Sequence, residues 1–174
     1  IGPLFEDTIW CVLSRMGFQE INSDNQFMIP ISKDPKVNPK QIDLFVKDEN
    51  CAILFECKAS EKSGTKSLRA HINEYNGMRQ QLIRSIRKHY NETLSIGIVF
   101  ATKNIVWSKS DLELAKTHNI IIMDESDFRY YSELVNHLGP AGKFQLLAEV
   151  FSRKRIPGLA LRIPAVRGRF GSTY

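Results

Sequence analysis

The sequence predicts an α/β domain built on a mixed sheet. Three observations lead to this fold class: a hairpin pattern ending at Lys58, a long helical pattern from Arg69 to Tyr90, and two later apolar runs of strand length. A short turn joins the hairpin strands, whereas the later strands are separated by helices. The sheet should therefore be antiparallel at the hairpin and parallel beyond it, with helices on its faces. The length of 174 residues suits one domain with a short appendage.

The first 40 residues predict a helix, a short strand and a loop. Apolar residues recur at helical spacing from Pro3 to Gly17, and Gly17 is a plausible stop. Phe27 to Ile31 predicts a short edge strand, because Pro30 is excluded from a central one. A polar loop with two prolines follows from Ser32 to Lys40.

The hairpin brings an aspartate and a glutamate together. Gln41 to Lys47 alternates as one strand, with Ile42, Leu44 and Val46 on one side, and Cys51 to Lys58 is the return strand. With a two-residue loop, Asp43 lies opposite Glu56, and a three-residue loop still leaves them neighbours. Glu56 and Lys58 share a face because strand side chains alternate.

The second half of the chain predicts alternating helices and strands. Lys62 to Leu68 is expected to be a loop, and Ser110 to Thr117 a short helix capped by Ser110 with Glu113 in a capping box. Asp124 and Asp127 are expected to be turn and cap residues. The other predicted elements are the helix Arg69–Tyr90, the buried strands Leu94–Ala101 and Asn119–Met123, and helices over 126–138 and 141–154 separated by Gly139-Pro140.

The group Asp43, Glu56 and Lys58 predicts a hydrolytic metal site. Two adjacent carboxylates repel each other unless a cation lies between them, and Mg²⁺ is a hard cation that takes carboxylate oxygens. The Cys57 carbonyl is a further oxygen ligand within reach. Lys58 can hold a water or stabilise charge on a phosphate. The alternative is an ordinary cross-strand ion pair on a wet sheet face.

Charge and composition indicate a polyanionic partner. The net charge of +5 is concentrated after Val150, where six cations occur without an acid, and a second basic cluster lies in residues 61–90. Such clusters suit nucleic acid, although the second could be a solvated helix face. No membrane span or secretion signal is seen, and three cysteines fit neither disulfides nor zinc, so a cytoplasmic setting is expected. Cys57 could be a nucleophile, but a buried filler is favoured.

Residues 4–128 resemble the PD-(D/E)xK nuclease superfamily, nearest its Mrr-type and Holliday-junction-resolvase-like branch. QIDLF carries the aspartate motif at Asp43, and FECKA carries the E-x-K motif at Glu56 and Lys58. The resemblance also implies an outer-shell glutamate, Glu6, and a glutamine on the following helix, where Gln80 is preferred to Gln81. Glu6 could instead favour its helix N-terminus. The family's proline before the aspartate is missing.

The resemblance implies a restriction-endonuclease-like sandwich, a mixed central sheet flanked by helices. It also implies a Mg²⁺-dependent deoxyribonuclease, with Mn²⁺ as a substitute, that cleaves double-stranded DNA as an endonuclease in prokaryotic restriction or defence. A homodimer is expected, with no membrane partner and no small-molecule cofactor. The alternatives are a non-catalytic nucleic-acid-binding or assembly module, or a purely structural domain. The residues expected to contact DNA are Lys62, Lys66, Arg69, Arg79 and Arg84.

The domain organisation is predicted from a change of composition near residue 157. Residues 1–135 are expected to form the nuclease-like domain, 136–156 a helical extension, and 157–174 a basic tail. The tail faintly resembles the start of a DGQHR-type domain. We therefore expect the natural protein to continue past residue 174.

Overall fold

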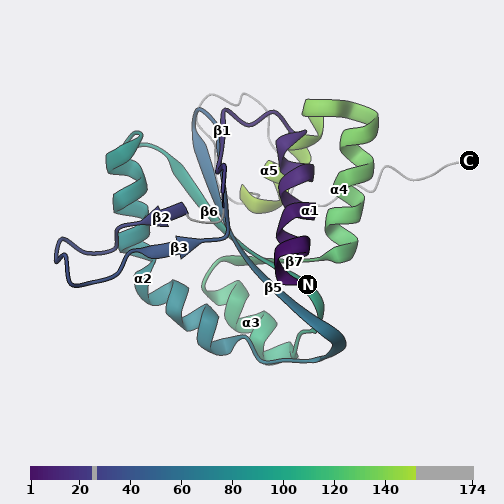
Figure 1. Ribbon diagram of the computed structural model, residues 1–174, viewed down its shortest axis with the longest axis horizontal. Helices are drawn as coiled ribbons and strands as arrows, with labels where there is room; N and C mark the ends of the chain where they lie inside the picture. Colours follow the sequence, from purple (N-terminus) through teal and green to yellow (C-terminus); the bar gives the residue numbers. More distant parts are fainter. Residues whose placement is uncertain (25–26, 152–174) are drawn as a thin grey trace, which may run out of the picture.

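The computed structural model describes residues 1–24 and 27–151, which form a mixed sheet with helices on both faces (Figure 1). The sheet has five strands in the order β1-β4-β5-β6-β7; β4 is antiparallel to β1 and β5, and β5, β6 and β7 are parallel. The predicted fold class is therefore confirmed. The strands are β1 Glu20–Ile21, β4 Leu44–Lys47, β5 Cys51–Thr65, β6 Ser95–Val106 and β7 Ile120–Asp124.

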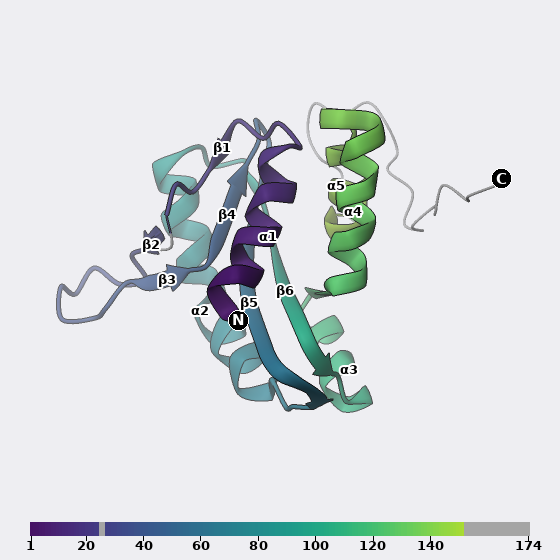
Figure 2. The same cartoon turned by 45° about the vertical axis from the view of Figure 1, so that its right-hand side comes forward.

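Two hydrophobic cores lie on opposite faces of the sheet. One contains residues of α1, α4 and α5, and the other contains residues of α2 and α3. Figure 2 shows α1 in front of the strands and α2 behind them. The side chains of β5 alternate between the two cores, so Phe55 faces α1 and Leu54 faces α2. The helices are α1 Gly2–Ser14, α2 Arg69–His89, α3 Lys109–Thr117, α4 Glu125–Leu138 and α5 Lys143–Phe151, with a 3₁₀ turn, η1, at Gly139–Gly142.

The hairpin between β4 and β5 has a two-residue loop, the shorter of the two lengths that the sequence allowed. Leu44 pairs with Phe55 and Lys47 with Ala52, and the Asp48 amide donates to the Cys51 carbonyl at 2.8 Å. This register places position 43 opposite position 56. The pairing that the site requires therefore follows directly from the loop length.

The strand predicted over Gln41 to Lys47 is broken at Asp43, and the single-strand prediction is wrong. Lys40–Ile42 is a separate strand, β3, which pairs with β2 (Phe27–Ile29) in a two-stranded sheet. The chain bends at Asp43 and then enters the main sheet as β4. Ile42 consequently packs in the α2 core, whereas Leu44 and Val46 pack in the α1 core.

The loop predicted over Lys62 to Leu68 is shorter than expected: β5 continues to Thr65 beside β6, and only residues 66–68 form the loop before α2. The two strands change register between Ala59 and Gly64. At this irregularity Asn104 adopts a positive φ of 57°, and its side-chain amide donates to the Ser60 carbonyl at 2.9 Å. The local hydrogen bond allows the strands to continue although their spacing is interrupted.

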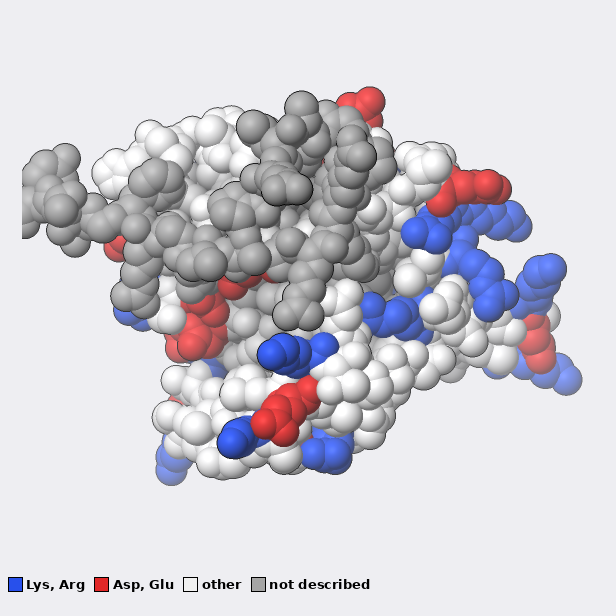
Figure 3. All heavy atoms as spheres, turned by 180° about the vertical axis from the view of Figure 1, so that it is seen from behind, with Lys and Arg blue, Asp and Glu red and all other residues white. Residues whose placement is uncertain are grey.

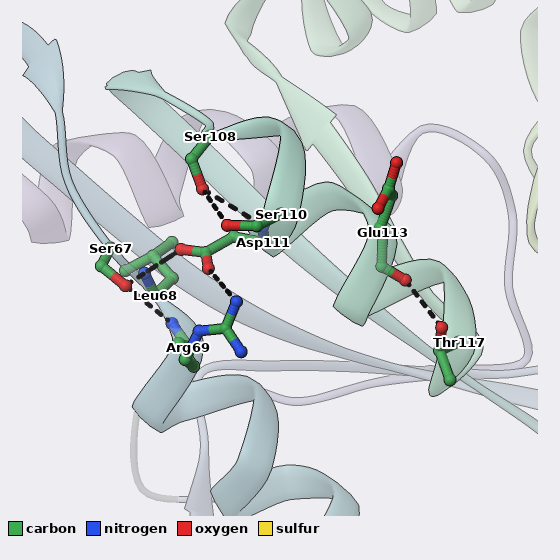
Figure 4. Close-up of polar contacts among 8 residues, drawn as sticks. All are labelled: Ser67, Leu68, Arg69, Ser108, Ser110, Asp111, Glu113 and Thr117. Carbon is green, nitrogen blue, oxygen red and sulfur yellow. Dashed lines mark hydrogen bonds and ion pairs between the residues drawn. The ribbon is translucent and has the colours of Figure 1, made fainter.

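Ser108, and not Ser110, caps α3, accepting a hydrogen bond from the Asp111 amide (Figure 4). The Asp111 side chain is buried and connects α3 to the start of α2. It accepts from the Ser67 hydroxyl at 3.0 Å and the Leu68 amide at 3.2 Å, and forms an ion pair with Arg69 at 3.3 Å. These contacts hold the N-terminal end of α2 against α3.

The C-terminal helices belong to the same core as the sheet. Asp124 and Asp127 form a capping box at the start of α4, as expected for turn and cap residues. Val150 and Phe151 of α5 pack over Gly97 of β6, so the predicted extension contributes to the core. The boundaries at 135 and 156 stay a prediction. The helix predicted over 152–154 and the basic tail lie outside the described residues.

The predicted helix stop, Gly17, lies three residues past the end of α1 at Ser14. Gly17 adopts a positive φ of 68°, a backbone conformation that favours glycine.

In the described part of the chain, no helix combines the length and apolar character that crossing a bilayer requires.

Candidate functional site

Glu56 and Lys58 lie on the same face of β5 and contact each other. The Lys58 ammonium is 2.6 Å from Oε1 of Glu56. The Glu56 side chain is only 5% exposed and that of Lys58 is 27% exposed. A buried carboxylate with a lysine at its solvent side is unusual on an ordinary wet sheet face, which disfavours the cross-strand ion-pair interpretation.

Asp43 faces β5 from the bend between β3 and β4. Its Oδ2 accepts a hydrogen bond of 2.7 Å from the Cys57 amide, the residue between Glu56 and Lys58. This bond pins the aspartate against the strand that carries the other two side chains. Asp43, Glu56 and Lys58 are therefore brought together as the hairpin pattern predicted.

Tyr75 of α2 is part of this group, although the sequence placed it only on the apolar side of its helix. Its buried hydroxyl donates to Oε2 of Glu56 at 2.5 Å. Its ring packs edge-on against Phe100 at 5.3 Å, and the Lys40 ammonium lies 4.8 Å from the ring centre. A buried tyrosine hydroxyl needs a polar partner, so a tyrosine within an aliphatic helix stripe was the available signal.

Asn22 is a second residue that the sequence did not identify. It is buried, and its Nδ2 donates to the Asp43 carbonyl at 3.1 Å while its Oδ1 accepts from the Phe45 amide at 2.8 Å. Its own amide also donates to the Phe45 carbonyl at 3.1 Å. Asn22 thus ties the bend at Asp43 to the start of β4. No sequence motif marks it.

Burial, reinforced by neighbouring carboxylates, dominates the electrostatics of the group. Burial raises the pKa of Asp43; the Cys57 amide opposes this shift, and the Glu56 charge adds to it. Burial, followed by the charge of Asp43, also raises the pKa of Glu6, a half-buried residue of α1. Glu6 is therefore close enough to these acids to be affected by them, as an outer-shell position requires.

Lys58 is the cation in contact with this acidic group. Burial alone would lower its pKa, but the hydrogen bond and charge of Glu56 outweigh burial and raise it. The side chain accordingly stays an ammonium at neutral pH. Lys58, with a smaller effect of Lys40 on Asp43, leaves the carboxylates of Asp43, Glu56 and Glu6 short of positive charge.

Cys57 is not suited to act as a nucleophile. Burial raises the pKa of its thiol well above the ordinary value, and the charges of Asp43 and Glu6 raise it further. Because the thiolate is the reactive form, a buried thiol among carboxylates is inert. The structure favours the interpretation of Cys57 as a buried filler.

The donor chemistry of the group fits a hard divalent cation. Carboxylate oxygens are the ligands that Mg²⁺ prefers, and a divalent ion would offset the excess negative charge. Within residues 1–24 and 27–151, however, no three His, Cys, Asp or Glu side chains are arranged to hold a metal as they stand. Both Glu56 oxygens are engaged, one by Tyr75 and one by Lys58. Metal binding through Glu56 Oε1 would therefore require Lys58 to move.

The other predicted site residues are dispersed. Gln80 and Gln81 are both exposed on α2, and in the described part of the chain no hydrogen bond joins either to the carboxylates. Gln80 as a site residue stays a prediction.

The predicted DNA-contacting cations differ in their availability. Lys62 and Lys66 are exposed near the end of β5, and Arg84 is exposed on the C-terminal half of α2. Arg69 is paired with Asp111. Arg79 is half-buried and donates to the carbonyls of His118 and Asn119 after α3, which makes it a structural link between helices. Burial lowers the pKa of Arg79.

The replacement Asp43→Asn is expected to stabilise the metal-free protein at pH 7, because the neutral amide avoids the cost of burying an ionised carboxylate. The folded state raises the pKa of Asp43 from its ordinary 3.8, so ionisation is penalised in the folded state. The penalty is complete above the folded pKa and vanishes below 3.8. The gain should accordingly fall as pH is lowered, which urea unfolding between pH 7 and pH 3 measures.

The control for this experiment is Asp34→Asn, since Asp34 is an exposed aspartate that also accepts a backbone amide hydrogen bond, from Lys36 at 2.9 Å. It should give no comparable pH-dependent gain. A stabilisation by Asp43→Asn that persisted at pH 3 would contradict the electrostatic origin.

Comparison with known proteins supports the fold. No family model matches the chain, and no curated protein matches it. The small subunit (R.BspD6I2) of the heterodimeric restriction endonuclease R.BspD6I superposes with a TM-score of 0.51 and 15% identity, over 84% of this chain and 77% of that one. The chain therefore has the restriction-endonuclease-like fold that was expected.

Two larger proteins contain a similar unit. Can2 from Sulfobacillus thermosulfidooxidans, solved in complex with cyclic tetra-adenylate, matches with a TM-score of 0.53 and 13% identity over 78% of this chain and 35% of Can2. Protein VC1899 from Vibrio cholerae matches with a TM-score of 0.51 and 12% identity over 80% of this chain and 33% of VC1899. The chain spans about a third of the length of each.

Proposed function

We propose that this chain is a metal-dependent nuclease domain that hydrolyses phosphodiester bonds in double-stranded DNA. The observation that carries the proposal is the convergence of Asp43, Glu56 and Lys58 at one end of the β4–β5 hairpin. It is supported by the fold, which is shared with a subunit of a restriction endonuclease. The two crowded carboxylates provide ligands for a cation. The lysine beside them provides an ammonium that can orient a water or stabilise charge on a phosphate.

Asp43 and Glu56 would hold Mg²⁺, with the Cys57 carbonyl as a further ligand and Glu6 in the outer shell. Mn²⁺ should substitute, because it accepts the same oxygen ligands. The bound ion would supply an activated water and polarise the scissile phosphate. Tyr75 fixes the Glu56 carboxylate by donating to Oε2, and Asn22 fixes the bend that aims Asp43.

Lys58 would have two roles in turn. Without a metal it neutralises Glu56 at 2.6 Å and so stabilises the buried carboxylate. When a cation takes that oxygen, the ammonium is free to orient a water or to stabilise charge on the phosphate. In the metal-free state the hydrogen bond and charge of Glu56 raise the pKa of Lys58, so the side chain is an ammonium when a cation arrives.

The substrate assignment rests on charge and on the resemblance to Mrr-type and Holliday-junction-resolvase-like nucleases. Lys62, Lys66 and Arg84 are exposed cations that could contact DNA phosphates, whereas Arg79 is already engaged by carbonyl groups. An endonuclease acting in prokaryotic restriction or defence, as a homodimer, is the form of this function that we favour.

A non-catalytic binding module is the second candidate, and one observation favours it. Both oxygens of Glu56 are already satisfied by Tyr75 and Lys58, so the carboxylate has no need of a metal. This module would bind DNA in a salt-dependent way without turnover.

Cleavage of supercoiled and linear DNA separates the two functions. Wild-type protein is incubated with Mg²⁺, with Mn²⁺ or with EDTA, beside Asp43→Ala. The nuclease proposal requires cleavage by wild type with either metal and none with EDTA or by Asp43→Ala. Salt-sensitive binding by both proteins without cleavage would establish the binding module in its place.

A further inference from the structure

A cavity of about 790 Å³ lies away from the carboxylates, between the C-terminal half of α2 and the segment from β2 to Lys33. This volume falls within the range of small-molecule and ligand sites, about 300–1,000 Å³. No residue proposed for metal binding lines it. The cavity is therefore distinct from the carboxylate site at the end of the β4–β5 hairpin.

The cavity has an apolar, aromatic wall. Phe27 and Tyr90 line it, and the ring of Phe45 is stacked against both. The Phe27 and Phe45 rings are 4.6 Å apart at 17°, and the Phe45 and Tyr90 rings are 6.0 Å apart at 13°. The rest of the apolar lining consists of Met28, Ile29, Pro30, Ile31 and Ile86. Flat, mutually supported rings of this kind suit the face of a nucleobase.

The rim of the cavity is basic. Lys33, Arg84 and Lys88 line it, and none of its lining residues in the described part of the chain is acidic. All three cations are exposed, and the described structure gives the side chain of none of them an ion pair or a hydrogen bond. Figure 3 shows Lys and Arg side chains predominating on the right-hand side of that view, where the β2–β3 loop lies. The charge complements an anionic occupant.

We infer that this cavity binds a short segment of single-stranded nucleic acid, with a base against the aromatic wall and phosphates along the cations. A single strand fits better than a free nucleotide because the cations are spread out. Arg84 and Lys88 are one helical turn apart, about 6 Å along α2, and Lys33 lies on a different segment. Such a spread covers successive phosphates, whereas the phosphates of a nucleotide are clustered at one end.

The cavity and the candidate active site share α2. Tyr75 touches Glu56, and Arg84 follows nine residues later, about 14 Å along the helix axis. A strand in the cavity could therefore extend to the carboxylates within a few nucleotides. This link rests on the proposed function and makes unpaired strands beside a duplex the favoured substrate. Binding itself requires no catalysis.

The test is the affinity of fluorescein-labelled oligothymidylate of eight nucleotides, measured by anisotropy in EDTA at low salt. Arg84→Glu and Lys88→Glu should each weaken binding about tenfold or more, because each reversal removes a phosphate contact and adds repulsion. Lys116→Glu is the matched control: Lys116 is equally exposed, on α3, and does not line the cavity, so its effect should stay below about twofold. Unchanged affinity in both cavity variants would overturn the inference.

Three further probes identify the occupant without altering the protein. An oligonucleotide of the same length with abasic sites should bind several-fold more weakly, and equal binding would overturn the role of the aromatic wall. Thymidine monophosphate should compete poorly; full competition at the oligonucleotide's own concentration would make this a free-nucleotide site. Equal binding of polyglutamate would make it a site for acidic peptides. Because EDTA suppresses cleavage, a failed nuclease assay leaves these outcomes unaffected.

Discussion

Replacing Lys58 by methionine is expected to reduce DNA cleavage about 10³-fold while leaving the domain folded. Methionine keeps much of the apolar stem but has no ammonium to orient water or to stabilise phosphate charge. It also removes the group that occupies Oε1 of Glu56 at 2.6 Å. Divalent cation binding should therefore be retained or tightened in this variant, since the competitor for that oxygen is gone.

The matched control is Lys103→Met on the adjacent strand. Lys103 pairs with Ala59 in the sheet, is 33% exposed, and forms an ion pair with Glu125 at 3.0 Å. It thus resembles Lys58 in setting but is not paired with a site carboxylate. Cleavage within about twofold of wild type is expected for it. Plasmid nicking rates and calorimetric Mn²⁺ titration measure both quantities, and an active Lys58→Met would contradict the assigned role.

Replacing Gly97 by alanine is expected to destabilise the domain by about 2–3 kcal/mol, or roughly 4–12 °C in Tm. A Cβ at this position on β6 would collide with Cγ1 of Val150 and lie 3.2 Å from Cζ of Phe151. Both side chains are buried in the α1 core, so α5 would have to shift away from the sheet.

Gly77→Ala is expected to change the stability of the domain in the opposite direction. Gly77 is inside α2, and a Cβ there meets nothing within 4 Å. Alanine at this position should stabilise the domain by about 0.5–1 kcal/mol, because alanine has a higher helix propensity and makes the unfolded chain less flexible. Thermal melts of the two variants test whether α5 is part of the core. A neutral Gly97→Ala would support the view that residues after 135 form a detachable extension.

The double variant Gly97→Ala, Val150→Ala refines this test. Val150→Ala alone removes buried methyl groups, whereas in the Gly97→Ala background it also removes the collision. The two effects should therefore not add, and the coupling should favour the double variant. Simple additivity would indicate that α5 has moved elsewhere.

The pattern that could be predicted from sequence is the one set by local geometry. Strand alternation and a two-residue turn were sufficient to place Asp43 opposite Glu56, and the register agrees. Helical spacing located α2 to within one residue of its ends. The helix cap of α3 was predicted less well. Ser108 and Ser110 are both good capping residues, and the structure uses Ser108 where the sequence pattern favoured Ser110.

The features that could not be predicted depend on contacts between distant segments. Asn22 bonds to the carbonyl of Asp43, which is 21 positions later, and Tyr75 of α2 reaches Glu56 of β5. The extension of β5 to Thr65 depends on β6, since its exposed, polar residues carry no strand pattern of their own. Arg79 belonged to a basic cluster in sequence, but His118 and Asn119 engage it.

By itself, the sequence determined the α/β class, the hairpin register and the meeting of two carboxylates with a lysine. Those properties follow from side-chain periods of 2 and 3.6 and from turn length, which act over a few residues. Only the tertiary structure decided that the chain bends at Asp43, that Tyr75 and Lys58 share the oxygens of Glu56, and that a basic, aromatic cavity forms beside α2. Each of these requires burial of a polar group or the packing of segments far apart in the chain, and no local pattern records such contacts.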